Sequence, residues 1–576
     1  MERYLGSGPS RTSAGDTRSM ENRPQYSGQS NISRIPLTCG VLSKRQIAIT
    51  ELTVSELQHR IRSRTLKATE ILEAFAARAA IAHQLVNCLT DWFYEEGLHC
   101  AKELDGKLES GGEPIGPLHG IPVALKDTYG LKGHVTTRGY IIGKGVVYDH
   151  TSDIVETLRS AGAVFFCRTT MPQTGFILET TSNLWGRTLN PFNNLLGAGG
   201  SSGGDAALVA MRGAPIALPS DIGGSIRAPA AFCGLYAIRP TSQRIPKGNW
   251  AGTMTGQVTV RDSAGPICYS IDDVRLFTEI IGSHQAQHRY DTNSVPLPWR
   301  KVSLPQKLAV GIMKWDGVVM PQPPVLRAIE HTKNVLLSAG FEGVLSMKLM
   351  SVSMRSYIIV VDFSPPVDCW ELAKCYYDLI FQDGAADTLA KVAISGEPLV
   401  PAFADLLKVF HARALAATEV LKLNLQTRAY KTIFAQAWDR TKDITSTGRP
   451  MDALICPCSP SAGIPHDFNV WWGYTSMWNL LDYPSTVVPV ANFKISPERD
   501  PPSTSYKPLT SNPYDKTNHE MYDPNLFVNQ PSTIQVVGRP FDDEELIEVS
   551  VTIDTELREH VATGQQLTKA NSLSKL

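Results

Sequence analysis

The sequence lacks several features that define common classes of protein. It has no run of 18 or more apolar residues, so no transmembrane helix is expected. No apolar segment follows the first basic residue at the N-terminus, so no secretory signal is expected either. Basic residues are not in excess, since 55 Lys and Arg balance 56 Asp and Glu, and this argues against a nucleic-acid-binding surface. These absences favour a cytoplasmic globular protein.

The ten cysteines also lack the spacing of a disulfide framework or a metal site. They are scattered over 576 residues, which is typical of reduced thiols. Cys456 and Cys458 have no second pair of ligands nearby, so we expect them to be buried packing residues. His284 and His288 are four residues apart without a third ligand or a glutamate, which favours a polar linker. No metal or organic cofactor is therefore expected.

The first 45 residues have few large apolar side chains and are rich in Ser, Arg, Gly, Asn and Gln. Such a segment buries too little surface to fold, so residues 1–45 are predicted to form a disordered tail. A mitochondrial transit peptide is the competing interpretation. Glu2, Asp16 and Glu21 argue against it, because such peptides are poor in acidic residues. The folded domain is expected over residues 46–576.

Strand and helix patterns alternate in the first half of this domain. Thr53 and Glu56 have the spacing of a capping box at the start of a helix. The apolar run 121–125 predicts a buried strand, with Lys126 at its end. Residues 153–161 predict a helix and residues 163–167 a strand. This alternation favours an α/β fold.

The second half is divided into a helical section and a return to the sheet pattern. Residues of about 302–442 are predicted to be helical, and residues 451–560 to rejoin the sheet. The elements expected there are helices at 327–339, within 402–440, at 474–481 and at 542–560, and strands at 453–457 and 485–490. Residues 496–525 are rich in Pro, Ser, Asn and Tyr, which predicts a long surface loop.

The most informative stretch lies between residues 199 and 230. It begins with Gly-Gly-Ser-Ser-Gly-Gly at 199–204 and ends with Asp-Ile-Gly-Gly-Ser-Ile-Arg-Ala-Pro-Ala at 221–230. Glycines allow close approach of the backbone to another group. Two glycines before a serine can present backbone N–H groups beside its hydroxyl, as a serine nucleophile with an oxyanion hole requires. A phosphate-binding loop is disfavoured, because no Gly-Lys-Ser/Thr follows the glycines.

This ordered pattern resembles the signature of the amidase signature family, which hydrolyses carboxamides with a Ser–Ser–Lys triad. Residues 85–90, 474–484 and 534–539 also look like the fungal acetamidase branch of that family. The resemblance implies the amidase signature fold, a mixed twisted β-sheet flanked by α-helices on both sides. Its signature core is expected at about residues 120–245.

Two segments depart from the family pattern. Pro219 precedes Asp221 by two residues, where the family usually has Gly or Ala. Residues 345–362 are also unusual, because 351–362 reads as an apolar insertion in place of a short strand and a Pro-rich turn. Whether this is a real insertion is left open by the sequence.

The resemblance assigns catalytic roles to three residues. Ser225 is the nucleophile, Ser201 is a bridging serine preceded by a cis peptide bond, and Lys126 is the base. Ser225 follows Ser201 by 24 residues and Lys126 by 99, as the family spacing requires. Lysine is a base only when neutral, and desolvation at the end of a buried strand lowers its pKa. Alone, each residue reads as an ordinary strand end or loop position, and only the combination favours catalysis.

The same comparison suggests how substrate is held. The residues expected to bind substrate are Gly175, Ser201, Ile222, Gly223, Gly224 and Ser225, with the N–H groups of 222–225 around the oxyanion. Asp221 and Arg227 are expected to pair and support this loop, and Ser202 to support it by hydrogen bonding. The aromatic residues expected to pack in the core, or alternatively to form a substrate wall, are Trp471, Trp472, Tyr474 and Trp478.

The resemblance implies an amidase, a C–N hydrolase that cleaves a linear amide to a carboxylate and ammonia or an amine through an acyl-enzyme. One alternative is an amidotransferase subunit that delivers ammonia to a partner protein. Another is a binding protein that keeps the fold without catalysis. A small-molecule amide is the implied ligand. Acetamide, larger aliphatic or aryl amides and a specialised metabolite all remain open, as does assembly into a homodimer.

Overall fold

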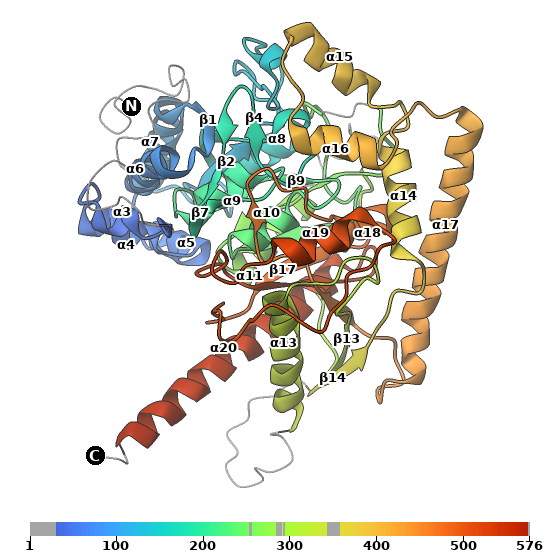
Figure 1. The fold of residues 1–576 in the computed structure, drawn as a ribbon. Coiled ribbons are helices and arrows are strands. Elements are labelled where there is room, and N and C mark those ends of the chain that lie inside the picture. The colour runs from blue at the N-terminus through green and yellow to red at the C-terminus, as the bar shows by residue number, and fades with distance from the viewer. Residues whose placement is uncertain (1–29, 253–255, 284–290, 292–293, 342–356, 574–576) are drawn as a thin grey trace.

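A sheet of 11 strands runs through the centre of the structure, a computed structural model that describes residues 30–252, 256–283, 291, 294–341 and 357–573 (Figure 1). The strand order is β1–β3–β2–β8–β12–β10–β17–β18–β15–β13–β14. Strands β2, β3 and β8 are parallel to one another, as are β13, β14 and β15, whereas the central pairs are antiparallel. The predicted mixed α/β sheet is therefore confirmed.

The strands of this sheet come from nearly the whole length of the chain. In chain order they are β1 Leu89–Trp92, β2 Pro122–Lys126, β3 Val164–Thr169, β8 Ile216–Leu218, β10 Tyr236–Arg239, β12 Ile267–Cys268, β13 Lys307–Ile312, β14 Tyr357–Asp362, β15 Ala453–Cys456, β17 Ser485–Pro489 and β18 Thr533–Val537. Three small sheets contain β9 Ser220–Asp221 with β11 Ser263–Ala264, β4 Thr181–Ser182 with β5 Gly186–Arg187, and β6 Leu189–Asn190, β7 Asn193–Gly197 and β16 Ile464–Pro465.

Side chains alternate between two cores on opposite faces of the sheet. Val123 and Leu125 belong to one buried cluster, whereas Ala124 belongs to another. Likewise Ile455 lies in the first cluster and Leu454 on the other side. Successive side chains of a strand point to opposite faces, so apolar residues at every position of a strand require helices on both sides.

Helices cover both faces, as predicted. Those contributing to the first cluster include α5 Val54–Arg62, α6 Ala68–Val86, α8 Asp153–Ser160, α11 Ile271–Ser283, α13 Pro323–Phe341 and α20 Asp543–Leu573. Those contributing to the clusters of the other face include α9 Gly203–Ala210, α10 Arg227–Phe232, α14 Cys369–Ile380, α16 Pro401–Val409, α17 Ala417–Arg440 and α18 Gly473–Leu481. The remaining α-helices are α3 Ile35–Thr38, α4 Lys44–Thr50, α7 Tyr94–Glu109, α15 Ala386–Ser395 and α19 Pro513–Met521.

Most predicted elements are confirmed within one or two turns. Helix α5 begins after Thr53 with the predicted capping box to Glu56. Strand β2 ends at Lys126, and the expected helix and strand after it are α8 and β3. The last helix, α20, was predicted to end near residue 560 but continues to Leu573 and runs outward from the sheet (Figure 1).

The predicted boundary of the tail at residue 45 is wrong. Residues 30–45 are folded, with helix α3 and the start of α4 packed against α6. Ile32, Ile35 and Leu42 are buried in the same cluster as α6, and the N–H of Ile32 donates to the carbonyl of Pro191. Composition alone underestimated the tendency of residues 30–45 to fold. A few apolar side chains are enough to order a segment when they are buried against a surface that is already folded. Residues 1–29 lie outside the described part of the chain.

Residues 302–442 were predicted to form a helical section, but this section also contains strands. It contributes strands β13 and β14, which pair in parallel at one edge of the main sheet. The segment 351–362, interpreted as an apolar insertion, ends in β14, and this explains its apolar composition. Residues 342–356 fall outside the described residues, so the start of that segment stays a prediction.

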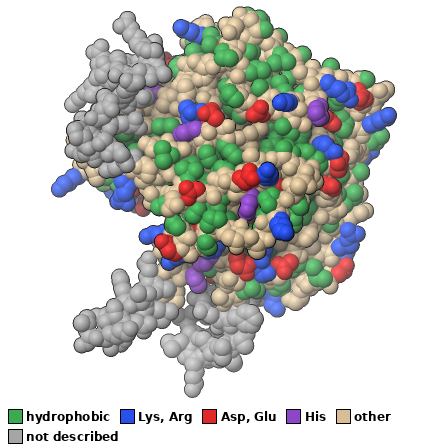
Figure 2. Space-filling view, in the orientation of Figure 1, with side chains coloured by type: hydrophobic (Ala, Val, Ile, Leu, Met, Phe, Trp, Pro, Cys, Tyr) green, Lys and Arg blue, Asp and Glu red, His purple; other side chains and the backbone are tan. Residues whose placement is uncertain are grey.

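The surface agrees with the balanced composition. Basic and acidic side chains are interspersed over the face shown in Figure 2.

The predicted loop 496–525 is interrupted by α19, whose Asp515 is buried and accepts hydrogen bonds from Met320 and Tyr506. In the described part of the chain, no helix combines the length and apolar character needed to cross a membrane.

Candidate active site

Lys126 is the last residue of β2 and is almost completely buried, with 1% of its surface exposed. Its Nζ donates to Ser201 Oγ at 2.8 Å and lies 3.3 Å from Ser220 Oγ and 3.4 Å from the Ser220 carbonyl. Burial lowers the pKa of Lys126 because a low-dielectric environment disfavours the ammonium. The charges of Asp205, Asp221 and Asp262 oppose this shift. The net direction is toward a more easily deprotonated amine.

Ser201 is presented by a glycine-rich turn ahead of α9. The Gly200–Ser201 peptide is cis, as the resemblance implies. A Cβ at residue 200 would lie 2.5 Å from the Ile177 carbonyl, so only glycine fits against this neighbouring backbone. The next residue, Ser202, is placed as predicted but gives only a long contact, 3.5 Å from its Oγ to the Ser220 carbonyl.

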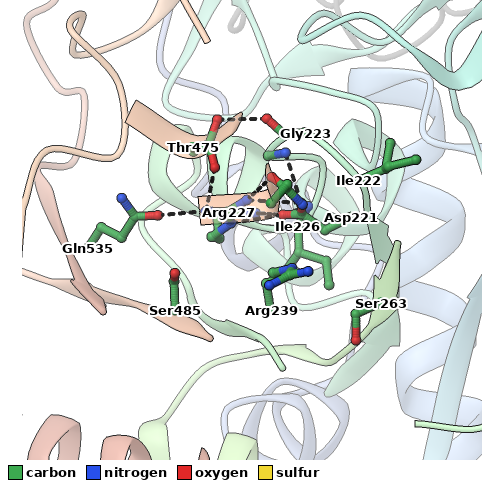
Figure 3. A network of polar contacts seen from close by, with 12 residues as sticks. Asp221, Ile222, Gly223, Ile226, Arg227, Arg239, Ser263, Thr475, Ser485 and Gln535 are labelled. Carbon is green, nitrogen blue, oxygen red and sulfur yellow. Dashed lines mark hydrogen bonds and ion pairs between the residues drawn. The ribbon is translucent and has the colours of Figure 1, made fainter. Parts of the chain in front are cut away.

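Ser225 lies in a loop held by a buried acid–base pair. Arg227 Nε and Nη2 each lie 3.0 Å from the Asp221 carboxylate, and neither side chain is exposed to solvent. Burial alone would raise the pKa of Asp221, but the adjacent Arg227 holds it well below its usual range. The predicted pairing of these two residues is confirmed (Figure 3).

This pair also fastens the loop to the C-terminal section. Arg227 donates to Gln535 on β18 at 2.9 Å (Figure 3). It also donates to Asn479 on α18 at 2.6 Å. Asn479 in turn donates to Asp221. The carboxylate also accepts the N–H groups of Gly224 at 2.8 Å and Ile226 at 3.1 Å. Both oxygens of the Asp221 carboxylate therefore accept hydrogen bonds, from the loop backbone, from Arg227 and from Asn479.

The engagement of Gly224 refines the predicted oxyanion donors. Its N–H is directed at Asp221 and is not available to a substrate in this arrangement. Its φ of +132° and the closeness of Thr475 both require glycine at this position. The N–H groups of Ile222, Gly223 and Ser225 have no partner among the described residues. These three are the donors that remain.

One cavity of about 360 Å³ brings the predicted residues together. Lys126, Ser201 and Ser225 all line it, although they lie on β2, the α9 turn and the loop before α10. Of the predicted substrate-binding residues, Gly175, Ser201, Ile222 and Ser225 line the cavity, whereas Gly223 and Gly224 lie between two lining residues. Other described lining residues are Thr128, Met171, Ser220, Lys247, Gly248, Asn249, Trp250, Gly252, Gly256, Gln257, Val258 and Asp262.

The outer wall of the cavity was missed by sequence reasoning. Lys247 forms an ion pair with Asp262, and its Nζ lies 5.8 Å from the centre of the Trp250 ring. These residues belong to the segment 247–262, which has no motif and no strong helix or strand pattern. Ser220 was also missed, although its position next to Asp221 in the signature gave a signal that could have been used.

The other candidate sites show no catalytic arrangement where the structure describes them. The aromatic residues Trp471, Trp472, Tyr474 and Trp478 are buried in one core cluster, which confirms the packing interpretation. All ten cysteines are free thiols, and Cys456 and Cys458 are both buried. His284 and His288 lie outside the described residues. Within the described residues no group of three His, Cys, Asp or Glu side chains is arranged to hold a metal ion.

The chain is similar to known proteins over most of its length. The sequence profile of the Amidase family matches residues 70–547. The chain is 54% identical over 535 residues to an amidase of Gibberella zeae, covering 93% of this chain and 95% of that protein. It is 36% identical to an acetamidase of Emericella nidulans, covering 91% and 92% of the two chains. The solved structure of a fatty acid amide hydrolase superposes with a TM-score of 0.83 at 31% identity, covering 92% and 89%.

Proposed function

Because the chain belongs to the amidase signature family and is an amidase, we propose that Ser225 is its nucleophile, with Ser201 as the proton relay and Lys126 as the base. The proposal rests on one observation above all. The amino group of a buried lysine lies 2.8 Å from Ser201 Oγ, in the same cavity that Ser225 lines. A solvated lysine at a strand end would have neither the burial nor this partner.

The first half of the proposed reaction forms an acyl-enzyme. Neutral Lys126 accepts the proton of Ser201, and Ser201 accepts the proton of Ser225 as its Oγ attacks the amide carbon. The carbonyl oxygen becomes an oxyanion, which backbone N–H groups of the nucleophile loop stabilise. The C–N bond then breaks as Ser201 returns a proton to the leaving nitrogen and Lys126 restores that of Ser201.

In the second half, water replaces the departed ammonia or amine. The same relay takes a proton from water, and the resulting hydroxide attacks the ester carbon of acylated Ser225. Collapse of this second tetrahedral intermediate returns the relayed proton to Ser225 and releases the carboxylic acid, which loses its proton to solvent to give the carboxylate. Each step uses groups already in contact or lining the cavity, and the protons balance without any further reactant.

The alternative roles are less well supported. An amidotransferase subunit would use the same triad but would pass ammonia to a partner, and the similarity to fungal amidases over nine-tenths of the chain favours simple hydrolysis. A binding protein without catalysis would have no need of a lysine buried beside two serines, because burying such a group unpaired is costly. Copurification of a second protein required for activity would favour the amidotransferase.

The test is covalent labelling by a fluorophosphonate probe, read by mass spectrometry of the labelled peptide. We expect one label per chain, on Ser225, and the amide hydrolysed fastest to protect against it. Labelling at another serine, or none with a folded protein, would contradict the proposed nucleophile. A series of amides with increasing acyl size, from acetamide to aryl amides, then defines the substrate.

A further inference from the structure

Three consecutive carbonyls of the nucleophile loop are each held by a hydrogen-bond donor. The Tyr376 hydroxyl on α14 donates to the carbonyl of Ile222 at 3.1 Å. The Thr475 hydroxyl on α18 donates to the carbonyl of Gly223 at 2.8 Å (Figure 3). The N–H of Ala228 donates to the carbonyl of Gly224 at 2.8 Å. The loop is therefore fastened on its carbonyl side by groups from three different elements.

Fixing a carbonyl also fixes the N–H of the same peptide unit. A trans peptide is planar, and its N–H points opposite to its C=O. The unit between Gly223 and Gly224 is held at both ends, by Thr475 and by Asp221. The unit between Ile222 and Gly223 is held only at its carbonyl, as is the unit between Gly224 and Ser225. Their N–H groups, on Gly223 and Ser225, have no partner among the described residues.

The loop thus contains two kinds of peptide unit: one whose N–H is bonded within the protein, and others whose N–H is free to bind substrate. Of these three peptide units, the first and the third present a free N–H, and that of the third, the N–H of Ser225, belongs to the proposed nucleophile itself. The carbonyl opposite the Ser225 N–H is held by main chain, at the start of α10. The carbonyl opposite the Gly223 N–H is instead held by a single side chain, that of Tyr376.

Tyr376 is placed for this role by close packing. It is fully buried, and its ring centroid lies 6.4 Å from that of Phe176. A Cβ at residue 223 would overlap the Tyr376 hydroxyl and would lie 3.2 Å from the Trp472 ring, so the missing side chain of Gly223 creates the space for this contact. Burial raises the pKa of Tyr376 well above its usual range, so the hydroxyl keeps its proton and stays a donor.

We propose that Tyr376 is a positioning residue for amide hydrolysis: by holding the carbonyl of Ile222, it aims the N–H of Gly223 at the substrate oxygen in the transition state. The inference rests on the proposed function, because it presupposes that Ser225 attacks the amide. Tyr376 itself does not line the cavity among the described residues and touches no reacting atom. Its effect is carried by one peptide unit.

The experiment compares Tyr376→Phe with Tyr377→Phe. Both substitutions remove one hydroxyl from adjacent buried tyrosines of α14, and the ring of Tyr377 stacks on Phe410. Two readouts are used: the second-order rate constant for fluorophosphonate labelling, whose phosphonyl oxygen needs the same donors, and kcat and KM for p-nitroacetanilide. Melting curves select a temperature at which all variants are folded.

Loss of an oxyanion donor costs about 10²–10³ in rate, and misaiming a donor that is still present should cost less. We expect Tyr376→Phe to slow labelling about tenfold and to lower kcat about tenfold at similar KM, while Tyr377→Phe stays within about twofold of wild type. Thr475→Val should have a smaller effect on labelling, because Asp221 still holds its peptide unit.

Two outcomes would overturn the inference: labelling of Tyr376→Phe at the wild-type rate, or equal losses in the two tyrosine variants, which would indicate general disturbance of α14. Its failure is distinguishable from failure of the proposed function. If the wild-type protein is labelled on Ser225 but Tyr376→Phe behaves like it, only the positioning role is wrong. If the wild-type protein is not labelled on Ser225, the proposed function itself is wrong.

Discussion

The signature segment 199–230 and the section 302–442 contribute to the same site in opposite ways. The first supplies Ser201 and Ser225, the serines proposed to react, from glycine-rich turns whose residue types are dictated by close backbone contacts. The second supplies no residue among the described lining of the cavity, yet its helix α14 packs against α18 and places Tyr376 behind the nucleophile loop. Residues that react are readable from a motif, whereas residues that aim them are dispersed in segments without one.

The largest effect is expected from a substitution in the signature segment, at the proposed nucleophile. Ser225→Ala removes the attacking oxygen, so amide turnover and fluorophosphonate labelling should both fall below detection. The fold should be kept, because Ser225 makes no side-chain hydrogen bond in the described structure and serine and alanine are similar in size. Turnover assays, mass spectrometry and a melting curve check this. Normal turnover in this variant would show that another residue attacks the amide.

Lys126→Ala should lose several orders of magnitude in kcat, since no other base forms a hydrogen bond with Ser201 among the described residues. Lys126→Arg should not restore activity, because a guanidinium keeps its proton. With Lys126 as the proposed base, wild-type activity depends on the neutral amine and should fall as pH decreases through the pKa of Lys126. Because burial lowers that pKa, this acid limb should lie below the value for a solvated lysine.

The corresponding measurement is kcat/KM against pH, with circular dichroism at each pH as the control for unfolding. A flat profile down to about pH 5 in a folded protein would contradict a neutral-lysine base.

Ser201→Ala should be less severe than loss of the nucleophile. It removes the relay between Lys126 and Ser225 but leaves the attacking hydroxyl in place, so acylation should slow strongly while Ser225 is still labelled slowly. Labelling kinetics on this variant measure the relay directly. Full activity would remove Ser201 from the mechanism.

The smallest effect on chemistry, with a clear effect on stability, is expected at the N-terminus. Truncation of residues 1–29 should leave the rate constants and the melting temperature nearly unchanged. Truncation of residues 1–45 also removes Ile32, Ile35 and Leu42 from the core cluster that contains α6. Burial of such side chains is worth roughly 1.5–3 kcal/mol each before the cost of ordering the segment. The longer truncation should therefore destabilise the fold by about 3 kcal/mol or more.

Denaturant unfolding of the two truncated chains gives the comparison. Equal stability would mean that the contacts of residues 30–45 contribute nothing net.

Sequence reasoning located elements whose cause is local. The capping box at Thr53, the apolar run of β2 and the glycines around Ser201 each reflect a requirement of their own few residues. It failed where the cause is a distant surface. Residues 30–45 fold because α6 and Pro191 receive them, and β14 is a strand because β13 offers an edge. The residues that line or support the cavity followed the same division, since Lys126, Ser201 and Ser225 were named from the sequence whereas Tyr376, Lys247 and Asp262 were not.

The buried Asp221–Arg227 pair has a consequence for when the protein becomes reactive during its synthesis. Arg227 is completed by Asn479 and Gln535, which follow it in the chain by 252 and 308 residues. During translation, Ser225 is therefore synthesised long before Asn479 and Gln535, whose side chains hold Arg227 in the loop. A nascent or truncated chain that ends before β18 carries the serine but leaves the guanidinium of Arg227 without its Gln535 partner. On the proposed mechanism we therefore expect hydrolysis only from chains in which β18 is in place, because Gln535 completes the contacts of Arg227.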